Sequence, residues 1–426
     1  MTRAATAGRT PAVAGASPTT VLLRAAADFR HGIVLPPEQV EPTLADIRGL
    51  TNIGVPANSD DPWAGATGGI AWTAESAAGA AVGEALERYA AAAFPLPKRP
   101  RSELRPEARV DADAFSLYSN EQRSRADFPH RALYRDDVAY TNVFSLPDNR
   151  ETWVPAALAS LNPGDGGVAT STGLAAGPTP YAALLRAVQE LVERDALAVT
   201  WLNGIPGRRV DLPPEHASAV ADLGGEAIGI DATPAHSPHP VALVAGHLPL
   251  RGTPRVALGA ACRERWTDAI DKAFVEWVQG ISFAGFHLEL ERRRPPKNAS
   301  ELKTFDDHAL YYTDHWEEWT RVPLLRGARA EPPPDRTPGT TRESLVELVD
   351  ALAREGVRVF YRDLTTPDLA EVGVCAVRAL SPELAPIACD EEWRFLDRPV
   401  QDVARRYPWA VDCGLSFPNP HPHPLG

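Results

Sequence analysis

The chain has 426 residues, 44% of them hydrophobic, and a formal net charge of −13; this length predicts one large domain or about two to three ordinary ones. The negative charge argues against a nucleic acid as the main ligand, because phosphate binding needs a basic field, and no apolar run approaches the ~20 residues that span a bilayer. The four cysteines form no C-x-x-C pair and follow no secretory signal, so we expect a reducing, cytoplasmic location.

The N-terminal part of the chain predicts a tail, a strand, a loop and a long helix. Residues 1–20 are rich in small side chains and show no apolar period, which indicates a flexible tail. Residues 32–35 are typical of a strand that two prolines end, and the glycines and the Asp-Asp-Pro of residues 58–69 indicate a loop. The Ala-rich stretch 73–93 contains no proline, so a helix is expected there.

The central part predicts two long helices with strands between them. Thr179 is a good N-cap and Pro180 a good first residue for a helix over residues 180–202, which carries an apolar stripe at helical spacing. The same kind of stripe predicts a helix over residues 267–286. Apolar runs at residues 240–244 and 255–258 predict strands.

The C-terminal part begins with a proline-rich surface loop at residues 326–340. A helix is expected over residues 342–354, and strands over residues 357–361 and 374–380. Helices and strands alternate without a regular βαβ rhythm, so the expected class is α+β or mixed α/β.

The most informative pattern is the motif E-x-x-E-R-x-A, which occurs in each of the first two long helices. Its spacing places Glu84 with Glu87, and Glu190 with Glu193, on one face of each helix. One interpretation is a solvated helix face on which Glu84 pairs with Arg88. The surrounding Ala, Leu and Val instead favour buried carboxylates, and several of these stay ionised together only around cations such as Mg²⁺.

The third long helix repeats this spacing with Glu276 and Gln279. Because Mg²⁺ usually bridges protein carboxylates and substrate phosphates, the residue types indicate a nucleoside triphosphate that is held through a metal ion. The glycine-rich residues 164–173 lack the lysine of a Walker A loop, and their glycines are more typical of an ordinary turn. No G-x-S-x-G motif is present, which argues against a serine hydrolase.

These motifs resemble those of a known family, in the same order along the chain. Residues 80–89 (AAVGEALERY) resemble the SALGEAIERY block of the YcaO family. Residues 171–177 (STGLAAG) and 190–196 (ELVERDA) resemble its second block, and residues 269–279 its third. Residues 363–368 (DLTTPD) resemble its DLT-x-PD turn, and residues 419–426 (NPHPHPLG) resemble the NP-x-PHPFP tail of its azoline-forming members.

The resemblance implies an α+β, YcaO-type fold with mixed sheets and long helices around a Mg-ATP site. It implies ATP-dependent cyclodehydration, in which a Cys, Ser or Thr side chain of a ribosomal precursor peptide attacks the preceding amide and yields a thiazoline or oxazoline. The metal ligands that it implies are Glu84, Glu87, Glu190 and Glu193. The ATP-binding residues that it implies are Glu84, Glu87, Arg88, Glu190, Glu193, Arg194, Glu276 and Gln279, and the catalytic residues are Pro422, His423, Pro424 and Gly426.

The alternating prolines of the tail predict a stiff segment, which we expect to reach the ATP site, where His423 or the terminal carboxylate would accept a proton. A polyproline tail without a role is the alternative. Two departures from the family pattern, Ala80 in place of serine and no lysine in residues 65–69, keep open a nucleotide-dead scaffold for partner enzymes. Within the enzymes, thioamide or amidine formation is the alternative reaction.

The expected division of the chain is a disordered tail (residues 1–20), a YcaO catalytic domain (21–417) and the Pro-rich tail (418–426). The stretch before the first motif helix is too short for a leader-recognising module, so we expect a separate leader-binding partner protein. The other expected partners are the precursor peptide, a second copy in a homodimer, and a flavin dehydrogenase as a further candidate. No nucleic acid and no membrane are expected.

Overall fold

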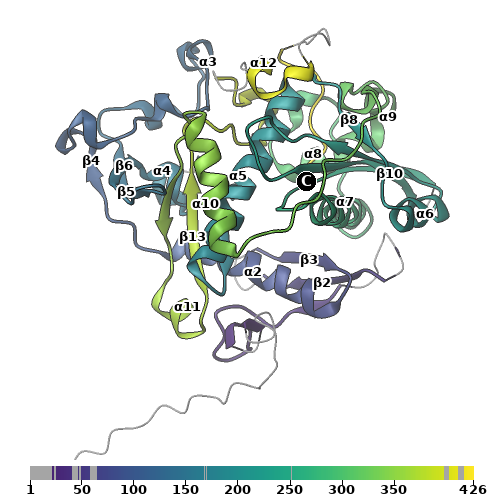
Figure 1. Cartoon of the computed structure of the whole chain (residues 1–426), viewed down its shortest axis with the longest axis horizontal. Coiled ribbons are helices and arrows are strands. Elements are labelled where there is room, and N and C mark those ends of the chain that lie inside the picture. Colours follow the sequence, from purple (N-terminus) through teal and green to yellow (C-terminus); the bar gives the residue numbers. More distant parts are fainter. Residues whose placement is uncertain are drawn as a thin grey trace, which may run out of the picture.

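The computed structural model describes residues 22–23, 25–40, 47, 49–57, 65–166, 168, 170–250, 252–397, 403–410 and 417–426 (Figure 1). The predicted tail over residues 1–20 and most of the loop over residues 58–69 lie outside these residues. Among the helices that the structure describes, none is both long and apolar enough to cross a membrane.

The described strands form three sheets, and every pair of neighbouring strands is antiparallel. The small sheet has the order β1 (Glu38–Gln39), β2 (Thr51–Val55) and β3 (Thr67–Ala71). The central sheet has the order β11 (Thr253–Cys262), β10 (Val241–Leu250), β9 (Glu226–Asp231) and β8 (Arg208–Val210). The third sheet has the order β4 (Arg99–Pro100), β5 (Ala139–Ser145), β12 (Phe360–Asp363), β13 (Cys375–Leu380) and β7 (Leu174–Gly177), with β6 (Glu151–Pro155) also paired to β5.

Four long helices occur where the sequence predicts them, with an N-cap of the expected type at three. The long helices are α2 (Ala74–Ala93), α5 (Pro180–Leu202), α7 (Trp266–Glu289) and α10 (Thr341–Arg354). The side chains of Thr73, Thr179 and Thr340 accept hydrogen bonds from the first turns of α2, α5 and α10. The other α-helices are α3 (Asn120–Ser124), α4 (Ala156–Ala159), α6 (Pro214–Asp222), α8 (Phe305–Asp314), α9 (Trp316–Trp319), α11 (Pro367–Glu371) and α12 (Val403–Arg406).

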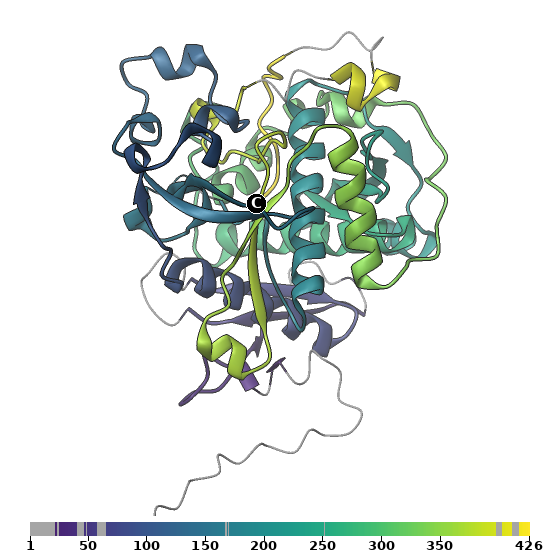
Figure 2. The same ribbon diagram turned by 60° about the vertical axis from the view of Figure 1, so that its left-hand side comes forward.

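The central sheet is covered on both faces. Successive side chains of a strand point to opposite faces; in β10, Leu243 and Ala245 pack into the core around α5, whereas Ala242 and Val244 pack into the core around α7. This double burial explains why β10 is a continuous apolar run. Helix α5 also contacts β13 and β7 of the third sheet, and α10 lies beside it in both views (Figures 1 and 2). Therefore α5 is buried on most sides.

Three predictions about strands and sheets are wrong. The strand over residues 32–35 is absent, since only Val34 pairs there, in an isolated bridge with Ala27. The expected loop up to Gly69 includes part of β3, because a glycine at this position lets the strand approach α2: a Cβ on Gly69 would lie 2.2 Å from the Ala77 carbonyl oxygen. The sheets expected to be mixed are antiparallel over the described strands, while the α+β class is confirmed.

Candidate active site

Three helices that are distant in sequence supply the predicted ATP-binding residues. Helix α2 carries Glu84 and Glu87, and α5 carries Glu190 and Glu193. Helix α7 carries Glu276; burial, and with it the charge of Glu276, raises the pKa values of both Glu190 and Glu193. The charge of Glu190 in turn raises the pKa of Glu87. The structure therefore brings these carboxylates within electrostatic reach of one another.

Arg194 lies between the two glutamates of α5. Its Nε atom is 3.6 Å from Glu190 Oε1 and 3.7 Å from Glu193 Oε1. Burial raises the pKa of Glu193 to about 8, against the opposing effect of Arg194. The Nη1 atom of Arg194 is buried and has no hydrogen-bond partner within the described residues. This cation is thus shared by more than one carboxylate.

Backbone amides orient three of the carboxylates. Glu87 Oε1 accepts a hydrogen bond from the Ala176 amide at 2.9 Å, and burial raises the pKa of Glu87 well above its usual value. Glu193 Oε2 accepts from the Cys262 amide, at the end of β11, at 3.0 Å. Each carboxylate is therefore fixed against a strand end or a turn, not only against its own helix.

The amide that orients Glu190 comes from a turn that only glycine fits. Glu190 Oε2 accepts from the Gly173 amide at 3.0 Å. Gly173 has a φ of 85°, and a Cβ there would lie 2.3 Å from the Ala379 carbonyl oxygen. The glycine of the S-T-G-L-A-A-G block is therefore required both by backbone conformation and by close packing on β13.

Glu84 and Arg88 lie at the open side of the cluster. Arg88 Nη2 is 2.5 Å from Glu84 Oε1, and the two side chains are 31% and 35% exposed. This is the i, i+4 pair on a helix face that the alternative interpretation predicts. Glu84 and Arg88 thus form a surface ion pair, and both charges also act on the pKa of the buried Glu87.

Helix α7 carries two of the predicted residues, Glu276 and Gln279, and each makes a polar contact. Glu276 Oε1 lies 3.2 Å from the Lys272 ammonium, and Gln279 Nε2 donates to the Gly68 carbonyl oxygen at 3.2 Å. Sequence reasoning missed Lys272, although its i, i+4 spacing to Glu276 is a signal. Lys272 therefore places an ammonium beside Glu276.

The donor set fits a hard divalent cation. As placed, no three His, Cys, Asp or Glu side chains in the described part of the chain form a group that could hold a metal ion, because backbone amides and Arg194 already engage the buried oxygens. However, burial raises the pKa values of Glu87, Glu190 and Glu193, so the ionised carboxylates are costly here unless a cation accompanies them. Carboxylate oxygens are the ligands that Mg²⁺ prefers, so these residues fit Mg²⁺ with a nucleotide phosphate.

A pocket lies beside Leu191, the residue that follows Glu190 on α5. Its lining includes Leu191 of α5, apolar side chains such as Phe115 and Phe395, and the buried Arg378 of β13. Arg378 donates to the carbonyl oxygens of Thr170 and Leu158, while burial lowers its pKa to about 10. The pocket therefore combines apolar walls with one cation, a feature that no sequence pattern indicates.

The C-terminal segment, residues 417–426, does not lie free on the surface. Asn419 donates from its amide to the Leu202 carbonyl oxygen at 2.7 Å, and Trp201 Nε1 donates to the His421 carbonyl oxygen at 2.7 Å. Pro422 and Pro424 are buried. Leu425 belongs to the same hydrophobic core as α5. The segment is therefore an internal part of the fold that runs along the C-terminal half of α5.

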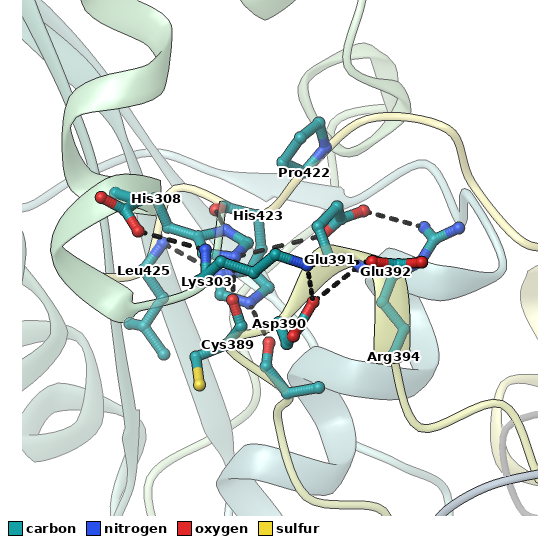
Figure 3. Close-up of polar contacts among 12 residues, drawn as sticks. Lys303, His308, Cys389, Asp390, Glu391, Glu392, Arg394, Pro422, His423 and Leu425 are labelled. Atoms are coloured by element: carbon teal, nitrogen blue, oxygen red, sulfur yellow. Dashed lines mark hydrogen bonds and ion pairs between the residues drawn. The ribbon is translucent and has the colours of Figure 1, made fainter. Parts of the chain in front are cut away.

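His423 is held on all sides (Figure 3). Its Nε2 atom lies 2.9 Å from the Ala388 carbonyl oxygen, and its Nδ1 accepts from the Leu425 amide at 3.3 Å. Burial, together with the charges of His308, Arg194 and Arg394, lowers its pKa well below the usual value. His423 is thus a neutral ring whose two nitrogens are engaged within the protein, near Arg194.

The end of the segment lies next to the helix that carries Glu276 and Gln279. A Cβ on Gly426 would lie 2.7 Å from Ala309 Cβ and 3.3 Å from the ring of Phe283. Phe283 is one helical turn beyond Gln279 on α7. Among the expected catalytic residues, Pro422, His423 and Pro424 are buried and Gly426 is exposed at this end.

Comparisons with known proteins give a family match and several similar structures. The family model described as YcaO cyclodehydratase, ATP- and Mg²⁺-binding, matches residues 68–385. No curated protein matches the chain. A heterocyclase solved in complex with substrate and cofactor is 21% identical with a TM-score of 0.72, over 96% of this chain and 57% of that one.

Two further similar structures are shorter proteins. YcaO from Methanopyrus kandleri, bound with AMPPCP and Mg²⁺, is 17% identical with a TM-score of 0.60, over 85% of this chain and 88% of that one. A chain of the E. coli microcin synthetase McbBCD complex is 14% identical with a TM-score of 0.61, over 84% and 90%. At such identities the likeness concerns the fold, and this chain spans just over half of the length of the heterocyclase.

Proposed function

The chain belongs to the YcaO family of ATP- and Mg²⁺-binding cyclodehydratases, and on that premise we propose that it converts Cys, Ser or Thr residues of a ribosomal precursor peptide into thiazolines or oxazolines. The observation that carries this proposal is the buried cluster of Glu87, Glu190 and Glu193, the last two of which share Arg194. A buried excess of carboxylates is costly in a purely structural role. It is useful where a divalent cation and phosphates bind.

In the proposed reaction, the side-chain thiol or hydroxyl adds to the preceding amide carbon, and the amide oxygen leaves with a phosphoryl group. When bound, ATP supplies that phosphoryl group and so turns a poor leaving group into phosphate. Glu84, Glu87, Glu190 and Glu193 would hold Mg²⁺, whose charge balances the phosphates. Glu276, Gln279, Arg88 and Arg194 would complete the ATP site, with the two guanidiniums facing phosphate or carboxylate oxygens.

We propose that the C-terminal segment shapes the site mechanically. A proton must leave the attacking thiol or hydroxyl, but both ring nitrogens of His423 are already engaged with Ala388 and Leu425. His423 therefore suits the role of an anchor better than that of a proton acceptor. Pro422, Pro424 and Gly426 would then form, with this anchor, a rigid wall whose end lies near Gln279 of α7.

Partner proteins are part of the proposal. One of the similar structures is a chain of the E. coli microcin synthetase McbBCD complex. This likeness and the family resemblance support a separate leader-binding partner. A homodimer and a flavin dehydrogenase rest on the family resemblance alone. A cytoplasmic location is supported by Cys262, Cys375 and Cys389, which are free thiols.

The test is to incubate the chain with ATP, Mg²⁺, a precursor peptide and the partner protein encoded beside it. We expect ATP consumption that depends on the peptide, and a product lighter by one water for each ring formed. Incorporation of sulfur would instead favour thioamide formation, and a coupling product would favour amidine formation. ATP left intact while the partner enzymes stay assembled on the chain would favour the scaffold.

A further inference from the structure

We infer that His308 is a positioning residue, which holds His423 and with it the C-terminal segment in the site. His308 lies on α8 and is completely buried. Its ring stacks on that of His423, with the centroids 4.0 Å apart and the planes 8° from parallel. Its Nδ1 atom lies 2.8 Å from the His423 carbonyl oxygen. One side chain thus contacts both the ring and the backbone of the residue that anchors the segment (Figure 3).

The Nε2 side of the His308 ring contacts the backbone at Cys389. Its Nε2 atom lies 2.9 Å from the carbonyl oxygen of Cys389. The adjoining residues are tied to the start of α8, because the Lys303 ammonium lies 3.0 Å from Asp390 and 3.1 Å from Glu392. His308 therefore joins α8, the backbone at Cys389 and the C-terminal segment, three parts of the chain that are distant in sequence.

Contacts of α8 beside His308 extend to the end of the C-terminal segment. Ala309, the next residue of α8, packs against Gly426, and Phe283 of α7 packs against the same glycine. Tyr312, one turn further along α8, donates from its hydroxyl to the Pro422 carbonyl oxygen at 2.6 Å. Because three successive contacts of α8 set the path of residues 422–426, a loss at His308 displaces the part of the segment that lies near Gln279.

The sequence carries no pattern that identifies this role. His308 belongs to none of the blocks that resemble the family, and a lone histidine on a short helix is more often a core residue. What distinguishes it is the combination of full burial, a stacked partner, and two carbonyl oxygens within hydrogen-bond distance. Because a neutral imidazole carries a single N–H, His308 donates to one of these two oxygens, and its ring is held between the two segments that carry them.

The test substitutes His308→Phe, which keeps an aromatic ring against His423 but removes both nitrogens. The control is His247→Phe, since His247 lies on β10, packs edge-on against Trp316 and makes no hydrogen bond to the described C-terminal segment. His308→Gln is the second variant in case the phenylalanine chain does not fold. Melting temperatures identify the variants that are folded.

The first readout is hydrogen exchange of the Leu425 amide, which depends on the position of His423. We expect this amide to exchange at least about 10-fold faster in the His308 variants, while the Asn419 amide, bonded to Leu202, changes little. The second readout rests on the proposed function: kcat for cyclisation should fall by about 10- to 100-fold, with the KM for ATP unchanged. Unchanged exchange at Leu425 in a folded variant overturns the inference, and this result does not depend on whether the chain forms azolines.

Discussion

The guanidinium of Arg406 donates from Nη1 to both carboxylate oxygens of Asp195, at 2.6 Å each, and both side chains are buried. Asp195 follows Glu193 and Arg194 on α5, so this pair lies directly behind the proposed ATP site. The same carboxylate accepts from the Ala385 amide at 2.8 Å. The pair therefore fixes the turn of α5 that carries the site residues against α12 and the strand-to-loop segment after β13.

Removing the charge of Asp195 should be strongly destabilising. In Asp195→Asn the buried guanidinium of Arg406 loses its counterion, and breaking a buried pair on one side typically costs about 3–5 kcal/mol. We expect the free energy of unfolding, measured by urea denaturation, to fall by this amount. Asp127→Asn is the control, because its pair with Arg125 is exposed and its loss should change stability very little. Equal effects of the two substitutions would contradict the role assigned to the buried pair.

Glu193→Gln should abolish ATP turnover without unfolding the chain. Glutamine keeps the shape of the side chain and can still accept from the Cys262 amide, but it removes a charge that we propose to face Mg²⁺. We expect a loss of at least about 100-fold in phosphate release, since even partners behind a metal ligand are often worth 10- to 100-fold. Melting temperature should hardly change, because burial already disfavours the ionised carboxylate.

The comparison for this variant is Glu317→Gln, a substitution of a carboxylate that is 88% exposed on α9. It should leave phosphate release at the wild-type rate. Normal phosphate release by Glu193→Gln, with peptide and partner present, would show that the carboxylate cluster does not bind the metal.

Acidification should release the C-terminal segment. Burial lowers the pKa values of both His308 and His423. For His308, the carbonyl oxygens of His423 and Cys389, and then the charges of Asp307 and Asp390, offset this only in part. Once the segment leaves, both rings return towards their ordinary pKa of about 6.5. The two histidines therefore make their full contribution to docking above about pH 6.5, and this contribution is lost as the pH falls below it.

The measurement is the melting temperature of the full chain and of a chain lacking residues 418–426, between about pH 8 and pH 5. We expect the difference between the two to shrink on acidification. Glu391 also faces this cluster, and burial raises its pKa to about 7, so its ionisation opposes docking at the alkaline end. A difference that grows as the pH falls would be inconsistent with neutral, docked histidines.

The sequence predicts the helices well and the site only in part. The alanine-rich, proline-free stretch places α2, and the Thr179 cap with the apolar period places α5, within a residue of their observed bounds. Composition, capping and periodicity are all local properties. The i, i+3 spacing likewise places Glu190 and Glu193 on one face. The meeting of α2 and α7 with this face involves segments that are distant in sequence. Only the family resemblance predicts it.

The parts that sequence reasoning missed depend on contacts across long stretches of chain. Gly68 and Gly69 suggest a loop, yet they form a strand because α2 packs closely on it. The alternating prolines indicate a stiff segment, but its burial depends on hydrogen bonds to distant residues. Tyr312 bonds to Pro422, 110 residues further along the chain, and Trp201 bonds to His421, 220 residues further along. Neither partner has a pattern of its own that points to the C-terminal end.

Deleting residues 418–426 should abolish azoline formation and should also lower thermal stability. A stiff tail on the surface would leave stability unchanged, but Leu425 is part of the largest core, and Asn419 fills a buried position beside Leu202. ATP affinity should stay within about 2-fold of the full chain, since in the described residues no hydrogen bond joins the segment to Glu87, Glu190 or Glu193. Calorimetric titration with ATP, melting temperature and product mass measure the three effects separately. Cyclisation by the truncated chain at the full-length rate would show that the segment has no part in the mechanism. It would also favour thioamide or amidine formation, because the resemblance to azoline-forming members rests on the proline-rich end.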